Sequence, residues 1–84
     1  MKIYLGEEGL NKTWQNPFPK TVKCYKCGGK ARIMFVGFED GEGGNICGLH
    51  DNMKDGKYWT HDCCAVAVYL CECCFEPNAL INQA

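Results

Sequence analysis

The segments Cys24-Tyr-Lys-Cys27 and Cys71-Glu-Cys-Cys74 each hold a pair of thiols separated by two residues. This spacing allows one tight turn to direct two sulfur atoms at a single ion. Two such turns that face each other make a closed tetrahedral four-sulfur site, the geometry that structural zinc prefers. The sequence therefore predicts a metal site whose ligands are Cys24, Cys27, Cys71 and Cys74.

The chain has 84 residues, and we expect residues 1–84 to form a single small domain. In domains of this size, folding entropy nearly cancels the hydrophobic gain, so a covalent or metal cross-link usually supplies the remaining stability. Eight of the residues are cysteine. At about a tenth of the chain, this content suits either a disulfide framework or a metal site.

The two kinds of cross-link belong to different compartments, because disulfides persist mainly in exported proteins. The first eight residues contain only three consecutive apolar residues, Ile3 to Leu5, which is too few for the core of a signal peptide. No stretch approaches the roughly 18 apolar residues of a membrane helix. We therefore expect a cytoplasmic protein without a membrane partner, in which the paired thiols bind metal. A secreted disulfide scaffold is the alternative.

The rest of the sequence is arranged around the two cysteine pairs. We expect five segments, which are an N-terminal arm (1–19), a first knuckle and strand (20–38), a long loop (39–58), a second strand and knuckle (59–76) and a C-terminal tail (77–84). The arm contains a short strand from Lys2 to Leu5. The loop is rich in glycine and acidic residues, and loops of this length are commonly functional or mobile. The tail is expected to form one or two helical turns that begin near Pro77.

Two stretches have apolar patterns that indicate strands. In 30–38 both sides are largely apolar, which indicates a central strand. A period of two places Ile33 and Phe35 on one face, with Met34, Val36 and Phe38 on the other. In 58–71 the same period places six residues on one face, namely His61, Cys63, Ala65, Ala67, Tyr69 and Cys71. Aromatic residues of the proline-rich arm, Trp14 and Phe18, are expected either to cover the core or to form a contact surface.

The motif Cys24-x-x-Cys27-Gly28-Gly29, together with the strand from Ala65 to Leu70 that runs into Cys71-x-x-Cys74, resembles the zinc-ribbon (rubredoxin-like double-knuckle) superfamily. This resemblance implies two knuckles on β-hairpins with one zinc ion between them. It gives the expected fold class, a small metal-stabilised β-rich domain with antiparallel strands and a short C-terminal helical turn. Two features depart from the pattern. The gap between the knuckles is 43 residues, against about 15–20 in compact motifs. Phe75 also stands after Cys74, where the first knuckle has glycine.

Iron is the chemical alternative to zinc, because rubredoxin-like proteins hold iron between the same paired knuckles and four thiolates do not select between the metals. We expect zinc, since nothing else in the sequence indicates electron transfer.

A second metal site is also a hypothesis. Cys-x-x-His and His-x-Cys motifs supply ligands suited to zinc, namely Cys47, His50, His61 and Cys63. In the alternative interpretation, Cys63 and Cys64 are small buried apolar residues, and the histidines are hydrogen-bonding residues at the surface or in the core.

The charges are unevenly distributed along the chain. Residues 1–32 carry seven Lys or Arg and two Glu, whereas residues 33–84 carry two Lys and eight Asp or Glu. This asymmetry indicates either a partner surface or a surface that pairs with itself. Basic residues with an aromatic among them suit phosphate contact and base stacking, namely Lys20, Lys23, Tyr25, Lys26, Lys30 and Arg32. The net charge of −1 disfavours nonspecific nucleic-acid binding, so a protein partner is at least as well supported.

Three well-known catalytic motifs are missing from the sequence, and a Cys–His nucleophile, either Cys47 with His50 or Cys64 with His61, is the catalytic alternative that stays open. The sequence contains no His-Glu-x-x-His helix, no deaminase signature and no phosphate-binding glycine loop. Four cysteines would also close the coordination shell that a catalytic zinc leaves open. We therefore expect a binding module that is not an enzyme. The thiols left outside the first site, Cys47, Cys63, Cys64 and Cys73, support a redox or metal-handling protein as the alternative.

Overall fold

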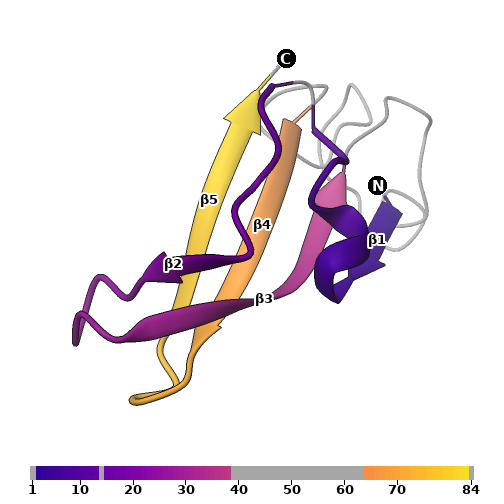
Figure 1. The fold of residues 1–84 in the computed structure, drawn as a ribbon. Coiled ribbons are helices and arrows are strands. Elements are labelled where there is room, and N and C mark those ends of the chain that lie inside the picture. Colours follow the sequence, from indigo (N-terminus) through magenta and orange to yellow (C-terminus); the bar gives the residue numbers. More distant parts are fainter. Residues whose placement is uncertain (1, 14, 39–63, 84) are drawn as a thin grey trace, which may run out of the picture.

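The computed structural model describes residues 2–13, 15–38 and 64–83. These residues form one antiparallel sheet with a short 3-10 helix, and no helix among them is long and apolar enough to cross a bilayer. The elements in chain order are β1 (Lys2–Leu5), η1 (Gly6–Gly9), β2 (Thr21–Lys23), β3 (Lys30–Phe38), β4 (Cys64–Cys71) and β5 (Pro77–Gln83). The strand order is β1-β3-β4-β5, and β2 also pairs with β3 (Figure 1). The small antiparallel β domain expected from the sequence is confirmed.

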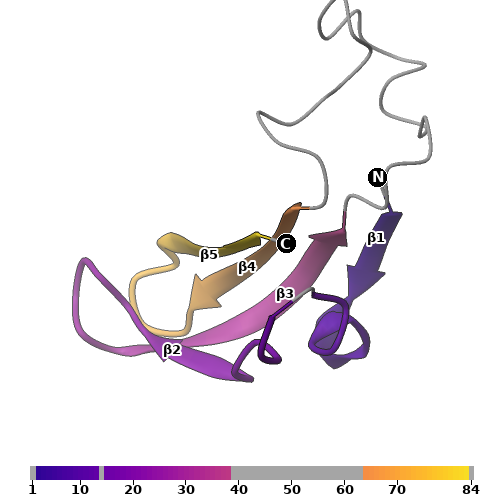
Figure 2. The ribbon, with the colours of Figure 1, turned by 90° about the horizontal axis from the view of Figure 1, so that it is seen from above.

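β3 is the centre of the sheet, because three other strands pair with it. β4 runs along one edge of β3, and the other edge is shared by β2 near its beginning and β1 near its end (Figure 2). This arrangement confirms the prediction of a central strand at 30–38 and of a short strand from Lys2 to Leu5. It also means that β2–β3 and β4–β5 are two hairpins joined side by side.

A β-bulge at Met34 changes which side chains of β3 face the core. The pairing with β4 shifts by one residue between Ile33 and Phe35, so Met34 has no opposite residue. Ile33 therefore shares the core face with Val36, which is fully buried. The prediction that Ile33 and Phe35 share a face is wrong, because one extra residue in a strand reverses the alternation after it.

The face predicted for the second strand agrees with the described part of β4. Its alternate residues Ala65, Ala67, Tyr69 and Cys71 are all fully buried. The small side chains of Ala65 and Ala67 leave room for the segment between η1 and β2, which crosses this face. The predicted extension through residues 58–63 lies outside the described residues.

The segment between η1 and β2 covers the core face of the sheet, and Figure 1 shows it passing across β4 and β5. Phe18 packs into the core with 4% of its surface exposed. The Tyr69 hydroxyl donates a hydrogen bond to the Pro19 carbonyl at 2.7 Å, and the Asn82 side chain donates to Thr13 Oγ1 at 3.0 Å. The prediction that Phe18 covers the core is confirmed, whereas Trp14 lies outside the described residues.

η1 packs against β3 through a glycine that has no room for a side chain. A Cβ atom on Gly9 would lie 2.6 Å from the Val36 Cβ and 2.8 Å from the Tyr4 Cβ. Any larger residue would force these backbones apart. Gly9 therefore allows η1 to pack closely against β1 and β3.

The C-terminal tail is a strand, so the predicted helical turn near Pro77 is wrong. All seven residues of β5 pair with β4, from Pro77 opposite Leu70 to Gln83 opposite Cys64. Proline is tolerated at the first position of a strand, and the sheet edge offered by β4 outweighs a weak local helix preference. The consequence for the site is that β5 brings Asn78 onto the core face, opposite Tyr69.

Candidate metal centre

The four predicted ligands lie in the turns of the two hairpins. Cys24 and Cys27 belong to the turn that joins β2 to β3. Cys71 ends β4, and Cys74 belongs to the turn that leads into β5. Because Ala31 at the start of β3 lies opposite Cys71, the pairing of β3 with β4 brings the two turns to the same corner of the sheet.

The four sulfur atoms form one cluster, in which all lie within 4.8 Å of one another. The Sγ atoms of Cys24 and Cys74 are 3.8 Å apart, and those of Cys27 and Cys71 are 3.4 Å apart. Around a tetrahedral ion with metal–sulfur bonds of about 2.3 Å, the sulfurs would be about 3.8 Å apart. The cluster therefore has the donor set and the size that a four-coordinate zinc or iron ion requires.

The first turn is a knuckle closed by three main-chain donors. The N–H of Cys24 donates to the Gly29 carbonyl at 2.8 Å, and the Cys24 carbonyl accepts a hydrogen bond from the Gly28 N–H at 3.0 Å. The N–H of Lys26 points at the Cys24 sulfur, with the nitrogen 3.4 Å away. Gly28 has a φ of +77°, which glycine adopts without steric cost.

The second turn repeats these contacts position by position. The N–H of Cys71 donates to the Glu76 carbonyl at 3.1 Å, and the N–H of Phe75 donates to the Cys71 carbonyl at 3.1 Å. The N–H of Cys73 points at the Cys71 sulfur from 3.4 Å. The backbone of this knuckle is therefore regular, although the sequence places Phe75 where the first knuckle has glycine.

Phe75 has a strained backbone conformation at this equivalent position. Its φ is +60°, and it is the one described residue other than glycine with a positive φ. The left-handed conformation costs an L-residue roughly 1–2 kcal/mol. The second knuckle thus keeps its shape at an energetic cost that the first one avoids, and binding of a metal by Cys71 and Cys74 would offset that cost.

The N–H donors concentrate on one sulfur of each knuckle. Backbone donors from Cys27 and Lys26, together with the Asn78 side chain, lower the pKa of Cys24 to about 6 despite its burial. The N–H groups of Cys74 and Cys73 lower the pKa of Cys71 in the same way. Hydrogen bonds to the charged form favour a thiolate, so each knuckle contains one buried sulfur that is prepared to bind a cation.

The other two sulfurs bear the repulsion within the cluster. The Gly29 N–H lowers the pKa of Cys27, but the neighbouring Cys71, Cys74 and Cys24 sulfurs raise it overall to about 12. The backbone donor from Glu76 lowers the pKa of Cys74, but desolvation and the Cys71 and Cys24 sulfurs raise it overall. Mutual repulsion therefore disfavours four thiolates at this site, and a bound metal ion would compensate their charge and displace the remaining protons.

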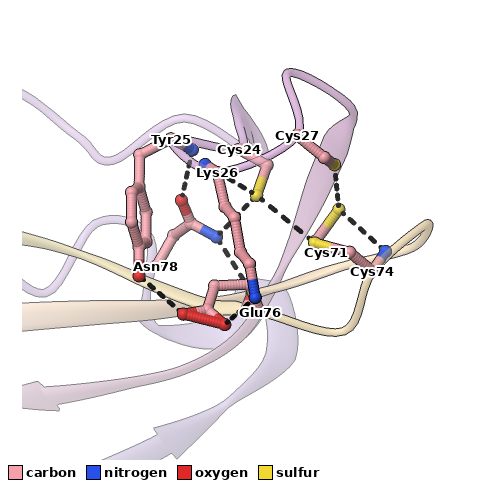
Figure 3. Close-up of polar contacts among 8 residues, drawn as sticks. All are labelled: Cys24, Tyr25, Lys26, Cys27, Cys71, Cys74, Glu76 and Asn78. Atoms are coloured by element: carbon pink, nitrogen blue, oxygen red, sulfur yellow. Dashed lines mark hydrogen bonds and ion pairs between the residues drawn. The ribbon is translucent and has the colours of Figure 1, made fainter.

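Asn78 connects the two knuckles and was missed by the sequence analysis. It is buried, and its Oδ1 accepts a hydrogen bond from the Tyr25 N–H at 3.0 Å. Its Nδ2 donates to the Glu76 carbonyl at 3.0 Å and points at the Cys24 sulfur from 3.6 Å (Figure 3). A single side chain thus orients the first turn, the second turn and one candidate ligand. A lone asparagine in a tail predicted to be helical gave no signal of this role.

Charged and aromatic side chains join the two turns at their outer surface. The Tyr25 hydroxyl donates to Glu76 Oε1 at 2.6 Å, and Lys26 Nζ lies 3.8 Å from Glu76 Oε2 (Figure 3). The hydrogen bond to Glu76 raises the pKa of Tyr25. These contacts connect the basic residues 1–32 to the acidic residues 33–84. They agree with the interpretation in which the charged surface pairs with itself.

The predicted second site, formed by Cys47, His50, His61 and Cys63, lies outside the described residues. Within the described ranges, the four-cysteine cluster is the one group of potential ligands close enough to share an ion. No protein-family model, no curated protein and no solved structure matches the chain.

The role of Asn78 is testable by an isosteric substitution. Asn78→Asp keeps an oxygen acceptor for the Tyr25 N–H but places a negative oxygen near the Cys24 sulfur. We expect metal affinity to fall about ten-fold or more, measured by competition with a chromophoric chelator. Asn82→Asp is the matched control, since Asn82 lies on the same face of β5 but contacts Thr13. Equal affinities for the two variants would contradict the assignment.

The strain at Phe75 is testable by comparing two truncations of the same exposed side chain. Phe75→Gly relieves the left-handed conformation, whereas Phe75→Ala removes the ring but keeps the strain. We expect the glycine variant to be more stable than the alanine variant by about 1 kcal/mol. Urea unfolding at a fixed free metal concentration measures this difference. A more stable alanine variant would show that the positive φ is not a source of strain.

Proposed function

We propose that this protein is a zinc-ribbon-type interaction module whose fold is held by one Zn2+ ion bound to Cys24, Cys27, Cys71 and Cys74. The observation that carries the proposal is the cluster of four sulfurs within 4.8 Å, contributed equally by two turns that are far apart in sequence. Matching backbone contacts in the two turns support the same conclusion.

The proposed role of the ion is structural. Within the described residues, the cluster consists of cysteines alone, and four thiolates fill a tetrahedral shell without leaving a position for substrate. The described core is also small, with eight buried apolar residues of which three are alanine. Metal binding contributes on the order of 10–16 kcal/mol to folding in domains of this kind, which is enough to compensate for such a core.

The proposed contact surface is the face of the sheet opposite the core. The strand registers place eight apolar residues there, and none of them is buried. They are Ile3, Leu5, Phe35, Val66, Val68, Leu70, Ala79 and Ile81. Ile3, Leu5 and Ile81 are 50%, 70% and 63% exposed. A continuous apolar patch of this kind usually marks a protein interaction site, so the partner we propose is a protein with an apolar surface of its own.

The basic residues give less support to a nucleic-acid partner. Of the five predicted phosphate contacts, three lie in ion pairs with carboxylates, namely Lys20 with Glu7 at 3.3 Å, Lys26 with Glu76 at 3.8 Å and Arg32 with Glu72 at 3.4 Å. These exposed pairs contribute little to stability, but they reduce the positive field that phosphate binding requires. Two cations, Lys23 and Lys30, have no ion pair to another described residue.

Metal identity and count test the structural part of the proposal. Native mass spectrometry with elemental analysis of the purified protein should show at least one zinc per chain. Two zinc ions would additionally support the site at Cys47, His50, His61 and Cys63. Iron, with visible absorption, would favour the rubredoxin-like alternative, and a metal-free folded protein would contradict the proposal.

The contact surface is testable by placing a photo-crosslinking residue at one position at a time in cells. At position 81, on the apolar face, we expect an adduct with a protein. At position 23, the last residue of β2 and one of the basic residues, we expect none. A nuclease-sensitive adduct at position 23, without a protein adduct at position 81, would replace the proposed partner with nucleic acid.

A further inference from the structure

Cys73 is a fifth thiol beside the four-sulfur cluster. It lies between Cys71 and Cys74 in the second turn, is exposed, and is not part of the cluster. It packs against Gly29 of the first turn. A Cβ atom on Gly29 would lie 3.0 Å from the Cys73 sulfur and 3.2 Å from the Cys27 sulfur. Because Gly29 has no side chain, the sulfur of Cys27 from the first turn and the sulfur of Cys73 from the second turn both lie close to the same point.

The sulfur that Cys73 approaches is the more accessible one of the first knuckle. Cys24 and Cys71 are buried, whereas Cys27 and Cys73 are exposed. Cys27 has one backbone donor at its sulfur, the Gly29 N–H at 3.3 Å. Cys24 has the Lys26 N–H and, in addition, the Asn78 side chain. Of the two candidate ligands in the first knuckle, Cys27 therefore has fewer hydrogen-bond donors at its sulfur.

We propose that Cys73 and Cys27 form a disulfide when the protein meets a peroxide, and that this reaction releases the metal ion of the proposed centre. The release of metal rests on the proposed function, whereas the formation of the disulfide does not. It gives the fifth thiol a role as the oxidation-sensitive residue of the domain.

The reaction needs one equivalent of peroxide as the two-electron oxidant. The Cys73 thiolate attacks one peroxide oxygen, the O–O bond breaks, and Cys73 becomes a sulfenic acid while the other oxygen leaves as hydroxide. The Cys27 thiolate then attacks the sulfenic sulfur, forms the S–S bond and displaces a second hydroxide. Two thiolates are oxidised and the peroxide is reduced to two hydroxides, which take up protons to become water. Three sulfur ligands, those of Cys24, Cys71 and Cys74, would then remain, and they would release the ion of the proposed centre.

The disulfide would keep the two turns connected after the metal has left. Cys27 belongs to the first turn and Cys73 to the second, so the bond joins the same two hairpins as the ion does. A disulfide between Cys71 and Cys73 or between Cys73 and Cys74 would lie within one turn and join nothing. Oxidation at this pair therefore exchanges one cross-link for another, and the oxidised domain is expected to retain its sheet.

The experiment compares metal release from three forms of the full chain after addition of hydrogen peroxide. A chromophoric chelator reports free zinc, and tandem mass spectrometry of proteolytic peptides locates the disulfide. The wild-type protein should release its zinc as the Cys27–Cys73 bond forms. Cys73→Ser should release zinc at least ten-fold more slowly, and Cys64→Ser, which removes a thiol at the far end of β4, should behave as the wild type does.

Two results would overturn the inference. One is release from Cys73→Ser at the wild-type rate, and the other is a disulfide that joins two ligands, Cys24 to Cys74 or Cys27 to Cys71. The peptide analysis also separates this inference from the proposed function. If the purified protein holds no metal, the centre is wrong, yet the presence or absence of the Cys27–Cys73 bond still decides the disulfide.

Discussion

The contact between the β2–β3 turn and the β4–β5 turn is the constraint on which the rest of the described structure depends. Strand pairing brings the turns together, but the sulfurs they bring would repel one another if all four were ionised. The opposite pKa directions at Cys24 and Cys27, lowered to about 6 and raised to about 12, show that the cluster resists a full negative charge. A bound cation would remove this repulsion and would cross-link the two turns.

The two knuckles reach one backbone shape from different sequences. Gly28 adopts its positive φ freely, whereas Phe75 adopts a similar one under strain. Asn78 adds a connection that neither knuckle has alone, because it bonds to both turns and to one sulfur. Such supporting contacts orient metal ligands, and here they are contributed by the strand that follows the second knuckle.

Much of this arrangement could be predicted from local patterns. Cysteine spacing identified the four sulfurs that come together, and alternation identified the buried face of β4. The prediction failed where distant contacts decide the structure. The bulge at Met34 reverses the alternation of β3, and pairing with β4 makes residues 77–83 a strand although their sequence has no strong strand signal. Once β5 was predicted as a helical turn, Asn78 could not be placed beside Cys24.

We expect the fold to require the metal, because the described core is small and the thiolate cluster is unfavourable without a cation. The most direct test is removal of the metal by a strong chelator under reducing conditions, followed by thermal unfolding and an amide proton–nitrogen NMR spectrum. We expect the cooperative melting transition to disappear and the dispersed amide signals to collapse, with both restored by added zinc. A metal-free protein that keeps a cooperative transition and a dispersed spectrum would contradict the account.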